Sequence, residues 1–177
     1  MKALFLDRDG VINIDSGYVF KKKDFKFING VFDLVKAARL KGYKVIVITN
    51  QSGIARGYYT EREFISLTNW MKNKFIDNSA PIDKVYFSPY HPTEGIGKYK
   101  LDHFTRKPRT GLIQRAKKRL KISLDQSILI GDQLSDIQCG LNAGIGKNIL
   151  FKATTIGNYV DKVSFKSIVI KNLHEAI

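Results

Sequence analysis

Short apolar runs rich in β-branched residues alternate along this chain with segments whose apolar residues recur at helical spacing. Such alternation is typical of repeated βαβ units, and it predicts an α/β fold with a doubly wound, mostly parallel sheet. The expected helices are Val31–Leu40, Gly111–Leu120 and a segment from the capping pair Thr60 and Glu63 to about Phe75. The expected strands are Lys2–Leu6, Lys44–Thr49, Ile82–Phe87, Ser127–Gly131, Asn148–Phe151 and Ser167–Ile170.

The length of the chain favours one domain. Its 177 residues, 44% of them hydrophobic, suffice for one ordinary core, so residues 1–177 are predicted to form a single domain. The segments that follow the first two expected strands are too short for a large cap domain. Loops are therefore expected to shape any pocket, including the long irregular segment Ser88–Pro108.

Charge and composition limit the partners. No apolar run approaches the length of about 18 residues that a membrane span needs, and the single cysteine, Cys139, fits a reducing compartment. We therefore expect a cytoplasmic monomer without membrane contact. The net charge of +14 favours an anionic partner, but the basic residues are scattered, with only modest runs at 21–23 and 117–119. This favours a small anionic metabolite over nucleic acid.

Polar side chains gather where expected strands end. Asp7 and Asp9 follow the first strand, Thr49 ends the second, Lys107 lies just before a helix, and Asp132 follows the fourth strand. Ligands of an open parallel sheet bind beyond the carboxyl ends of its strands. These residues are therefore predicted to form one site.

The residue types in this set suit phosphoryl transfer. Asp7 and Asp9 are spaced i and i+2, so on extended backbone they point the same way, one to attack and one to shuttle a proton. A carboxylate that attacks an anionic phosphate needs a hard cation on oxygen ligands, and Asp132 supplies a further carboxylate, which predicts Mg²⁺. Lys107 is expected to balance charge on the nucleophile and the phosphoryl group. Thr49 and neighbouring backbone N–H groups would hold the phosphoryl oxygens.

These motifs resemble a known superfamily. Asp7-x-Asp9-Gly10, Thr49, Lys107 and Gly131-Asp132-x-x-x-Asp136 are similar to the four motifs of the haloacid dehalogenase-like phosphohydrolases over most of the chain. The resemblance implies that Asp7 is the phosphorylated nucleophile and that Asp9 is the general acid and then the base. It also implies that Mg²⁺ binds Asp7, Asp132 and the backbone carbonyl of Asp9.

Longer matches narrow the resemblance. The runs Leu6–Asn13, Thr49–Gly57 and Arg106–Pro108 resemble the branch that holds D-glycero-D-manno-heptose 1,7-bisphosphate phosphatases and histidinol phosphatases. The resemblance implies hydrolysis of the C7 phosphate of the heptose bisphosphate to give the 1-phosphate. The fork of Arg106 suits a second phosphate. The expected substrate contacts are Arg8, Asp15, Ser16, Gly17, Tyr18, Asn50, Gln51, Ser52 and Arg106.

One departure from the branch concerns zinc. Many members hold a structural zinc just before the Arg-Lys-Pro run, and the corresponding positions here are Ser88, Tyr90, His103 and Thr105. Three of these four are not ordinary zinc ligands. We therefore expect no zinc and a loop held by its own packing.

Other functions stay open at this point. Histidinol-phosphate phosphatase, or a broader sugar phosphatase, is the nearest alternative, and turnover on the two substrates separates them. The charge of +14 also allows a phosphatase acting on nucleic-acid ends. A non-catalytic binding module could keep the fold, although the intact set of Asp7, Asp9, Lys107 and Asp132 argues against it.

Overall fold

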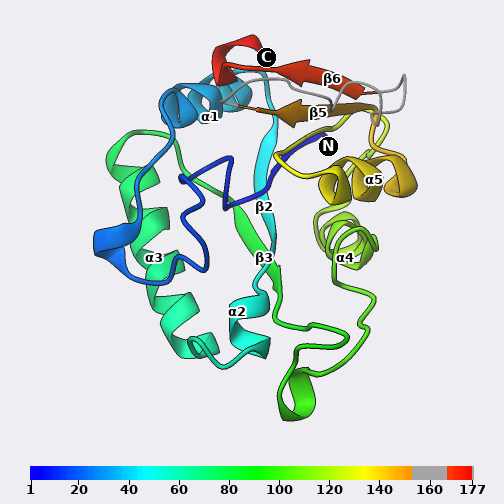
Figure 1. Ribbon diagram of the computed structural model, residues 1–177. Coiled ribbons are helices and arrows are strands. Elements are labelled where there is room, and N and C mark those ends of the chain that lie inside the picture. The colour runs from blue at the N-terminus through cyan, green and yellow to red at the C-terminus, as the bar shows by residue number, and fades with distance from the viewer. Residues whose placement is uncertain (153–166, 177) are drawn as a thin grey trace.

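A single parallel sheet organises the fold. The computed structural model describes residues 1–152 and 167–176, and its sheet has the strand order β3-β2-β1-β4-β5-β6 with every pairing parallel (Figure 1). The predicted doubly wound parallel sheet is therefore confirmed. The strands are β1 (Ala3–Leu6), β2 (Lys44–Asn50), β3 (Lys84–Ser88), β4 (Ile128–Gly131), β5 (Lys147–Phe151) and β6 (Ser167–Ile170).

Helices cover both faces of this sheet. In Figure 1, α1 and α3 lie on one side of the central strands, and α4 and α5 lie on the other. The helices are α1 (Val31–Leu40), α2 (Ser52–Ala55), α3 (Glu61–Asp77), α4 (Gly111–Leu120) and α5 (Leu134–Ala143). Within the described residues, the short 3-10 turns are η1 (Lys22–Asp24), η2 (Gly97–Tyr99) and η4 (Leu173–Glu175).

The sequence of β1 explains its central place. Leu4 and Leu6 point into the core under α1 and α3, whereas Ala3 and Phe5 point into the core under α4 and α5. Side chains of a strand alternate between the two faces of its sheet, so an entirely apolar strand needs cover on both. All four side chains are fully buried.

The longest helix, α3, begins at the predicted capping box. The Thr60 hydroxyl accepts a hydrogen bond from the Glu63 backbone N–H at 3.2 Å, and the Glu63 carboxylate accepts one from the Thr60 N–H at 2.8 Å. Both bonds satisfy N–H groups that a helix start otherwise leaves unpaired. Within residues 1–152 and 167–176, no helix combines the length and apolar character needed to cross a membrane.

The strand order brings three functional strand ends together. β1 pairs with β2 on one side and with β4 on the other, so the direction of winding reverses between β1 and β4. Ligands of doubly wound folds bind at such a switch point. Asp7 follows β1, Thr49 lies near the end of β2, and Asp132 follows β4.

Candidate active site

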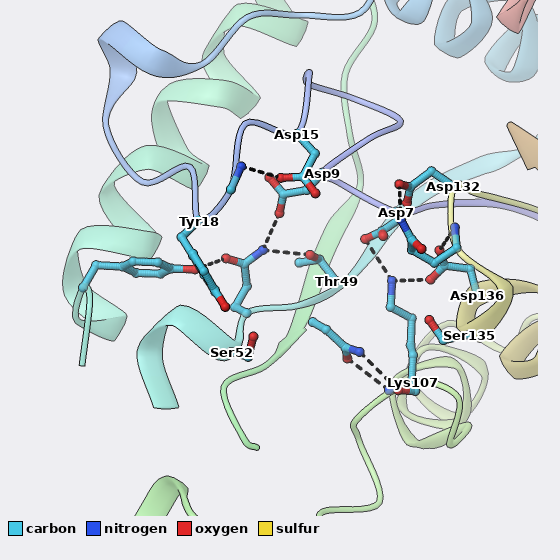
Figure 2. A pocket seen from close by; sticks show the side chains of 15 residues that line it. Asp7, Asp9, Asp15, Tyr18, Thr49, Ser52, Lys107, Asp132, Ser135 and Asp136 are labelled. Atoms are coloured by element: carbon cyan, nitrogen blue, oxygen red, sulfur yellow. Dashed lines mark hydrogen bonds and ion pairs between the residues drawn. The ribbon is translucent and has the colours of Figure 1, made fainter. Parts of the chain in front are cut away.

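A pocket of about 400 Å³ opens at the carboxyl ends of these strands. Figure 2 shows Asp7, Lys107, Asp132 and Asp136 gathered on one side of it and Asp9, Asp15 and Tyr18 on the other. The sequence-predicted residues that line it are Asp7, Asp9, Asp15, Gly17, Tyr18, Thr49, Asn50, Gln51, Ser52, Lys107 and Asp132.

Lys107 joins two carboxylates in the floor of the pocket. Its ammonium lies 2.9 Å from Asp7 Oδ1 and 2.6 Å from Asp136 Oδ1, and its side chain is almost completely buried. Burial disfavours the charged form of Lys107, but Asp136 and Asp7 outweigh that effect and raise its pKa above the usual value. The residue therefore stays a cation beside the predicted nucleophile.

The backbone around Lys107 is fixed by β2. The Asn50 side chain donates a hydrogen bond to the Lys107 carbonyl at 3.2 Å and accepts one from the Lys107 N–H at 3.0 Å. The Lys107 ammonium also donates to the Ile48 carbonyl at 3.1 Å. Asn50 lines the pocket, and its amide is occupied in positioning Lys107.

Three carboxylates suit a hard cation. Oxygen atoms of Asp7, Asp132 and Asp136 lie within 4.8 Å of one another, and Asp132 Oδ1 is buried without a hydrogen-bond partner among the residues that the structure describes. Gly10 has φ +84°, and a Cβ there would overlap the Asp132 carboxylate, so glycine allows this close approach. A buried oxygen without a partner beside two further carboxylates fits Mg²⁺, which prefers oxygen ligands.

Burial changes the titration of these acids. It is the main cause that raises the pKa of Asp7 to about 8; Lys107 opposes the rise and Asp136 adds to it. Burial and then the charge of Asp136 raise the pKa of Asp132 to about 6. Burial and neighbouring negative charge thus both disfavour the ionised forms of these two carboxylates.

Asp9 is held by three donors, two from its own loop after β1 and one from the segment after β2. Its Oδ1 accepts hydrogen bonds from Arg8 Nη2 at 2.7 Å and Asn13 Nδ2 at 3.0 Å, and its Oδ2 accepts one from Gln51 Nε2 at 3.0 Å. Gln51 Nε2 also donates to Thr49 Oγ1 at 2.8 Å. The two predicted catalytic residues on this side are thus tied to each other through one amide.

Arg8, an expected substrate contact, is buried, and its contact with substrate stays a prediction. Arg8 is 1% exposed and does not line the pocket. Besides Asp9, its guanidinium binds the Val19 carbonyl at 2.7 Å and lies 5.6 Å from the ring centre of Phe64. These contacts hold the Arg8 side chain in the interior.

Two arginines each contact a tyrosine, and one of these tyrosines, Tyr18, lines the pocket. The guanidinium of Arg56 lies 5.9 Å from the ring centre of Tyr18, and Arg106 donates a hydrogen bond to the Tyr90 carbonyl at 3.1 Å. Burial and then the charge of Arg56 lower the pKa of Arg106. Arg106 and Ser16 do not line the pocket itself, so their substrate contacts stay predictions.

The four positions that correspond to zinc ligands in relatives lie together in this chain. Thr105 Oγ1 donates to Ser88 Oγ at 3.1 Å, His103 Nδ1 lies 2.6 Å from Thr105 Oγ1, and His103 stacks on Tyr90 at 4.1 Å between ring centres. Hydrogen bonds and stacking therefore join the ends of the loop that carries Arg106. The expected lack of zinc stays a prediction.

Sequence reasoning did not assign every residue of the site. Asp136 was part of a quoted motif but had no role, although it forms the shorter ion pair with Lys107. Gln133 Nε2 donates to Asp132 Oδ2 at 2.7 Å. The remaining unassigned lining residues are Ser135 and Tyr59. The position of Asp136 one helical turn after Asp132 was the available signal.

Comparisons with known proteins agree with this geometry. Residues 3–154 match the family model described as polynucleotide kinase 3 phosphatase. The D-glycero-alpha-D-manno-heptose-1,7-bisphosphate 7-phosphatase of Burkholderia mallei is 52% identical over 84% of this chain and 79% of its own. The D-glycero-beta-D-manno-heptose-1,7-bisphosphate 7-phosphatase of Haemophilus influenzae is 45% identical over 85% of this chain and 82% of its own.

A solved structure extends the similarity to the fold. The D,D-heptose 1,7-bisphosphate phosphatase of B. bronchiseptica, complexed with magnesium and phosphate, matches with a TM-score of 0.83 and 25% identity. The match covers 98% of this chain and 94% of that one. The chain therefore belongs to the haloacid dehalogenase-like phosphohydrolases, in the branch that contains the heptose bisphosphate phosphatases.

Proposed function

We propose that this chain is a single-domain cytoplasmic enzyme that removes the C7 phosphate from a D-glycero-D-manno-heptose 1,7-bisphosphate. The observation that carries the proposal is the meeting of Asp7, Lys107 and Asp132 in one pocket at the switch point of the sheet. Relatives that share 45–52% of their residues with most of this chain are named for that activity. The site supports the chemistry, and the relatives indicate the substrate.

The first half of the reaction is transfer of the phosphoryl group to the enzyme. An oxygen of Asp7 attacks phosphorus while the bond from phosphorus to the C7 oxygen breaks. Asp9 donates its proton to that leaving oxygen, so heptose 1-phosphate departs as an alcohol. Lys107 and Thr49 stabilise negative charge on the phosphoryl oxygens.

Water completes the cycle. Asp9 is now a carboxylate and takes a proton from the water that attacks the phosphorus, which breaks the bond to Asp7 and releases phosphate. Asp7, Asp132 and the carbonyl of Asp9 would hold Mg²⁺. When bound, that ion supplies charge that lets a carboxylate approach an anionic phosphate.

Magnesium is expected to stabilise the folded protein, and more so at pH 8 than at pH 6. The carboxyl pKa values of about 8 for Asp7 and about 6 for Asp132 exceed the usual 3.8. Stability of the metal-free protein should therefore fall as pH rises through these values, and a cation should restore it. A concentration of one hundred times Kd contributes about 2.7 kcal/mol, or about 5–10 °C in Tm.

Thermal unfolding with and without MgCl₂ at both pH values measures this effect. Asp132→Asn should lose most of the magnesium-induced rise in Tm, because it removes an expected ligand. Asp125→Asn, at an exposed position, is the matched control and should keep the rise. An equal rise in the Asp132 variant would contradict the assignment of this carboxylate to the metal.

Arg106 is expected to distinguish a bisphosphate from a monophosphate. We assign it to the phosphate that stays on the sugar, because its guanidinium suits phosphate and lies outside the lining of the pocket in which the reacting groups meet. Arg106→Ala should lower kcat/KM for heptose 1,7-bisphosphate by about 10- to 100-fold, the range for hydrogen bonds to a charged group. Heptose 7-phosphate, which lacks the second phosphate, should lose much less.

Steady-state kinetics on both sugars, with Arg109→Ala as control, test this assignment. Arg109 follows on the same loop, is half exposed and pairs with Asp102, so its loss should leave the ratio of the two substrates unchanged. Equal damage to both substrates by Arg106→Ala would assign the arginine to the reacting phosphoryl group or to the fold.

A substrate panel tests the function as a whole. Both anomers of heptose 1,7-bisphosphate, histidinol phosphate and DNA with a 3′-phosphate cover the candidate classes. The DNA arm is included because the matching family model is named for a polynucleotide phosphatase and the chain carries a charge of +14. The proposal requires the highest kcat/KM on a heptose bisphosphate, and faster turnover of histidinol phosphate or DNA would replace it.

A further inference from the structure

Tyr59 carries a buried phenol in the lining of the pocket. The reaction described above gives this phenol no role. It is 4% exposed, and its hydroxyl donates a hydrogen bond to Gln51 Oε1 at 2.6 Å. Burial, opposed by the charge of Arg8, raises the pKa of Tyr59 above its usual range. The phenol therefore remains a hydrogen-bond donor throughout the neutral pH range.

That donor determines which way the Gln51 amide faces. With its oxygen bound to Tyr59, Gln51 must present Nε2 to Asp9 Oδ2 and Thr49 Oγ1, at 3.0 and 2.8 Å. The opposite orientation would place the amide oxygen against the carboxylate of Asp9. One phenol thus selects the orientation that supports the acid.

The hydrogen bonds of Asp9 show why this orientation matters. Oδ1 accepts from both Arg8 and Asn13, so Oδ2 is the oxygen best placed to exchange a proton with the leaving group. Gln51 Nε2 is the donor that holds Oδ2. Free rotation of the Gln51 amide would remove that support, so that Oδ2 would be held only through the hydrogen bonds of Oδ1 to Arg8 and Asn13.

The ring of Tyr59 is itself held in place by packing. It stacks on Phe20 with 5.1 Å between ring centres and belongs to a small core with Ile54 and Phe64. A Cβ at Gly53 would overlap the ring, so glycine lets α2 lie directly against it. Replacement by phenylalanine would keep this packing and remove the hydroxyl alone.

We propose that Tyr59 is a positioning residue for the general acid, which acts through Gln51 to hold Asp9 Oδ2 toward the leaving oxygen. This inference rests on the proposed function in that Asp9 must be the acid. In the step concerned, the Asp9 proton moves to the leaving oxygen as the bond from phosphorus to that oxygen breaks and the bond to Asp7 forms. Tyr59 itself gains and loses no proton.

The test compares leaving groups. An alkyl phosphate such as heptose bisphosphate needs its leaving oxygen protonated, whereas p-nitrophenyl phosphate releases a stable phenolate and depends little on the acid. kcat/KM reports the steps up to loss of the leaving group, so the later attack of water does not enter. Tyr59→Phe should lower kcat/KM for the alkyl substrate by about 3- to 10-fold, the worth of one neutral hydrogen bond, and leave the aryl substrate within about twofold.

Three further variants test whether the effect passes through Gln51 and not through the fold. Tyr86→Phe is the matched control, because the Tyr86 hydroxyl is buried without a partner among the described residues, and it should change neither substrate. Gln51→Met should reproduce the alkyl-selective loss, and the double variant with Tyr59→Phe should be no worse than Gln51→Met alone.

The outcomes separate the inference from the function on which it rests. The positioning role would be overturned if Tyr59→Phe left the rate on the alkyl substrate unchanged or lowered the rates on both substrates equally. Additive losses in the double variant would overturn it as well. Asp9→Asn provides the reference, because it should lower kcat/KM for the alkyl substrate by about 100-fold or more and affect the aryl substrate much less. If Asp9→Asn shows no such selectivity, the general-acid assignment fails first, and the role of Tyr59 fails with it.

Discussion

Asp7→Asn is expected to reduce phosphate release to background on every substrate. An amide is a poor nucleophile, so no aspartyl-phosphate can form whatever the leaving group. The fold should persist, because Lys107 keeps its ion pair with Asp136 at 2.6 Å when the charge of Asp7 is removed. Phosphate release and intact-protein mass after brief exposure to substrate measure turnover and the phosphorylated intermediate.

The control for this prediction is a second paired carboxylate. Asp83 binds Arg39 and Lys44, each at 2.9 Å, at the opposite end of β2 from the pocket. Asp83→Asn should lower stability and leave turnover per folded molecule unchanged. A phosphoryl adduct that still forms in Asp7→Asn would assign the nucleophile to another residue.

The fold was predictable because its signal is local. β1 is apolar at every position, and this alone requires a strand covered on both faces. Strand ends were less certain: β3 begins at Lys84, two residues after the predicted Ile82, and continues through Ser88. The carboxyl end of β3 is set by the parallel pairing of Ser88 with Asn50. A contact between such distant segments cannot be predicted from the sequence of either segment alone.

The site was predictable only in part, because some of its contacts join segments that are distant in the sequence. Asp7 and Asp132 follow strands, so their meeting follows from the order of the sheet. The roles of Arg8 and Gln51 depend on which neighbours the folded chain brings within 3 Å, and no spacing in the sequence reveals them. Polar residues of the loops were therefore assigned to substrate, although several are occupied in holding the catalytic groups in place.

Lys107→Met is expected to lower both stability and activity. The substitution keeps much of the side-chain volume but leaves Asp7 and Asp136 buried without their cation. Breaking a buried ion pair in this way costs about 3–5 kcal/mol. Loss of the positive charge beside the phosphoryl group should also lower kcat by about 100- to 1,000-fold, as for other groups that stabilise charge in the transition state. Urea unfolding without metal and phosphate release with MgCl₂ measure the two effects.

A double variant separates these two roles of the lysine. Lys107→Met with Asp136→Asn removes one of the two carboxylates, so the repulsion between Asp136 and Asp7 disappears and much of the lost stability should return. Activity should not return, because the phosphoryl group still lacks the ammonium that lies 2.9 Å from its acceptor oxygen on Asp7. If the double variant recovers turnover together with stability, Lys107 serves only to balance buried charge, and stabilisation of the transferring phosphoryl group must come from the metal and Thr49.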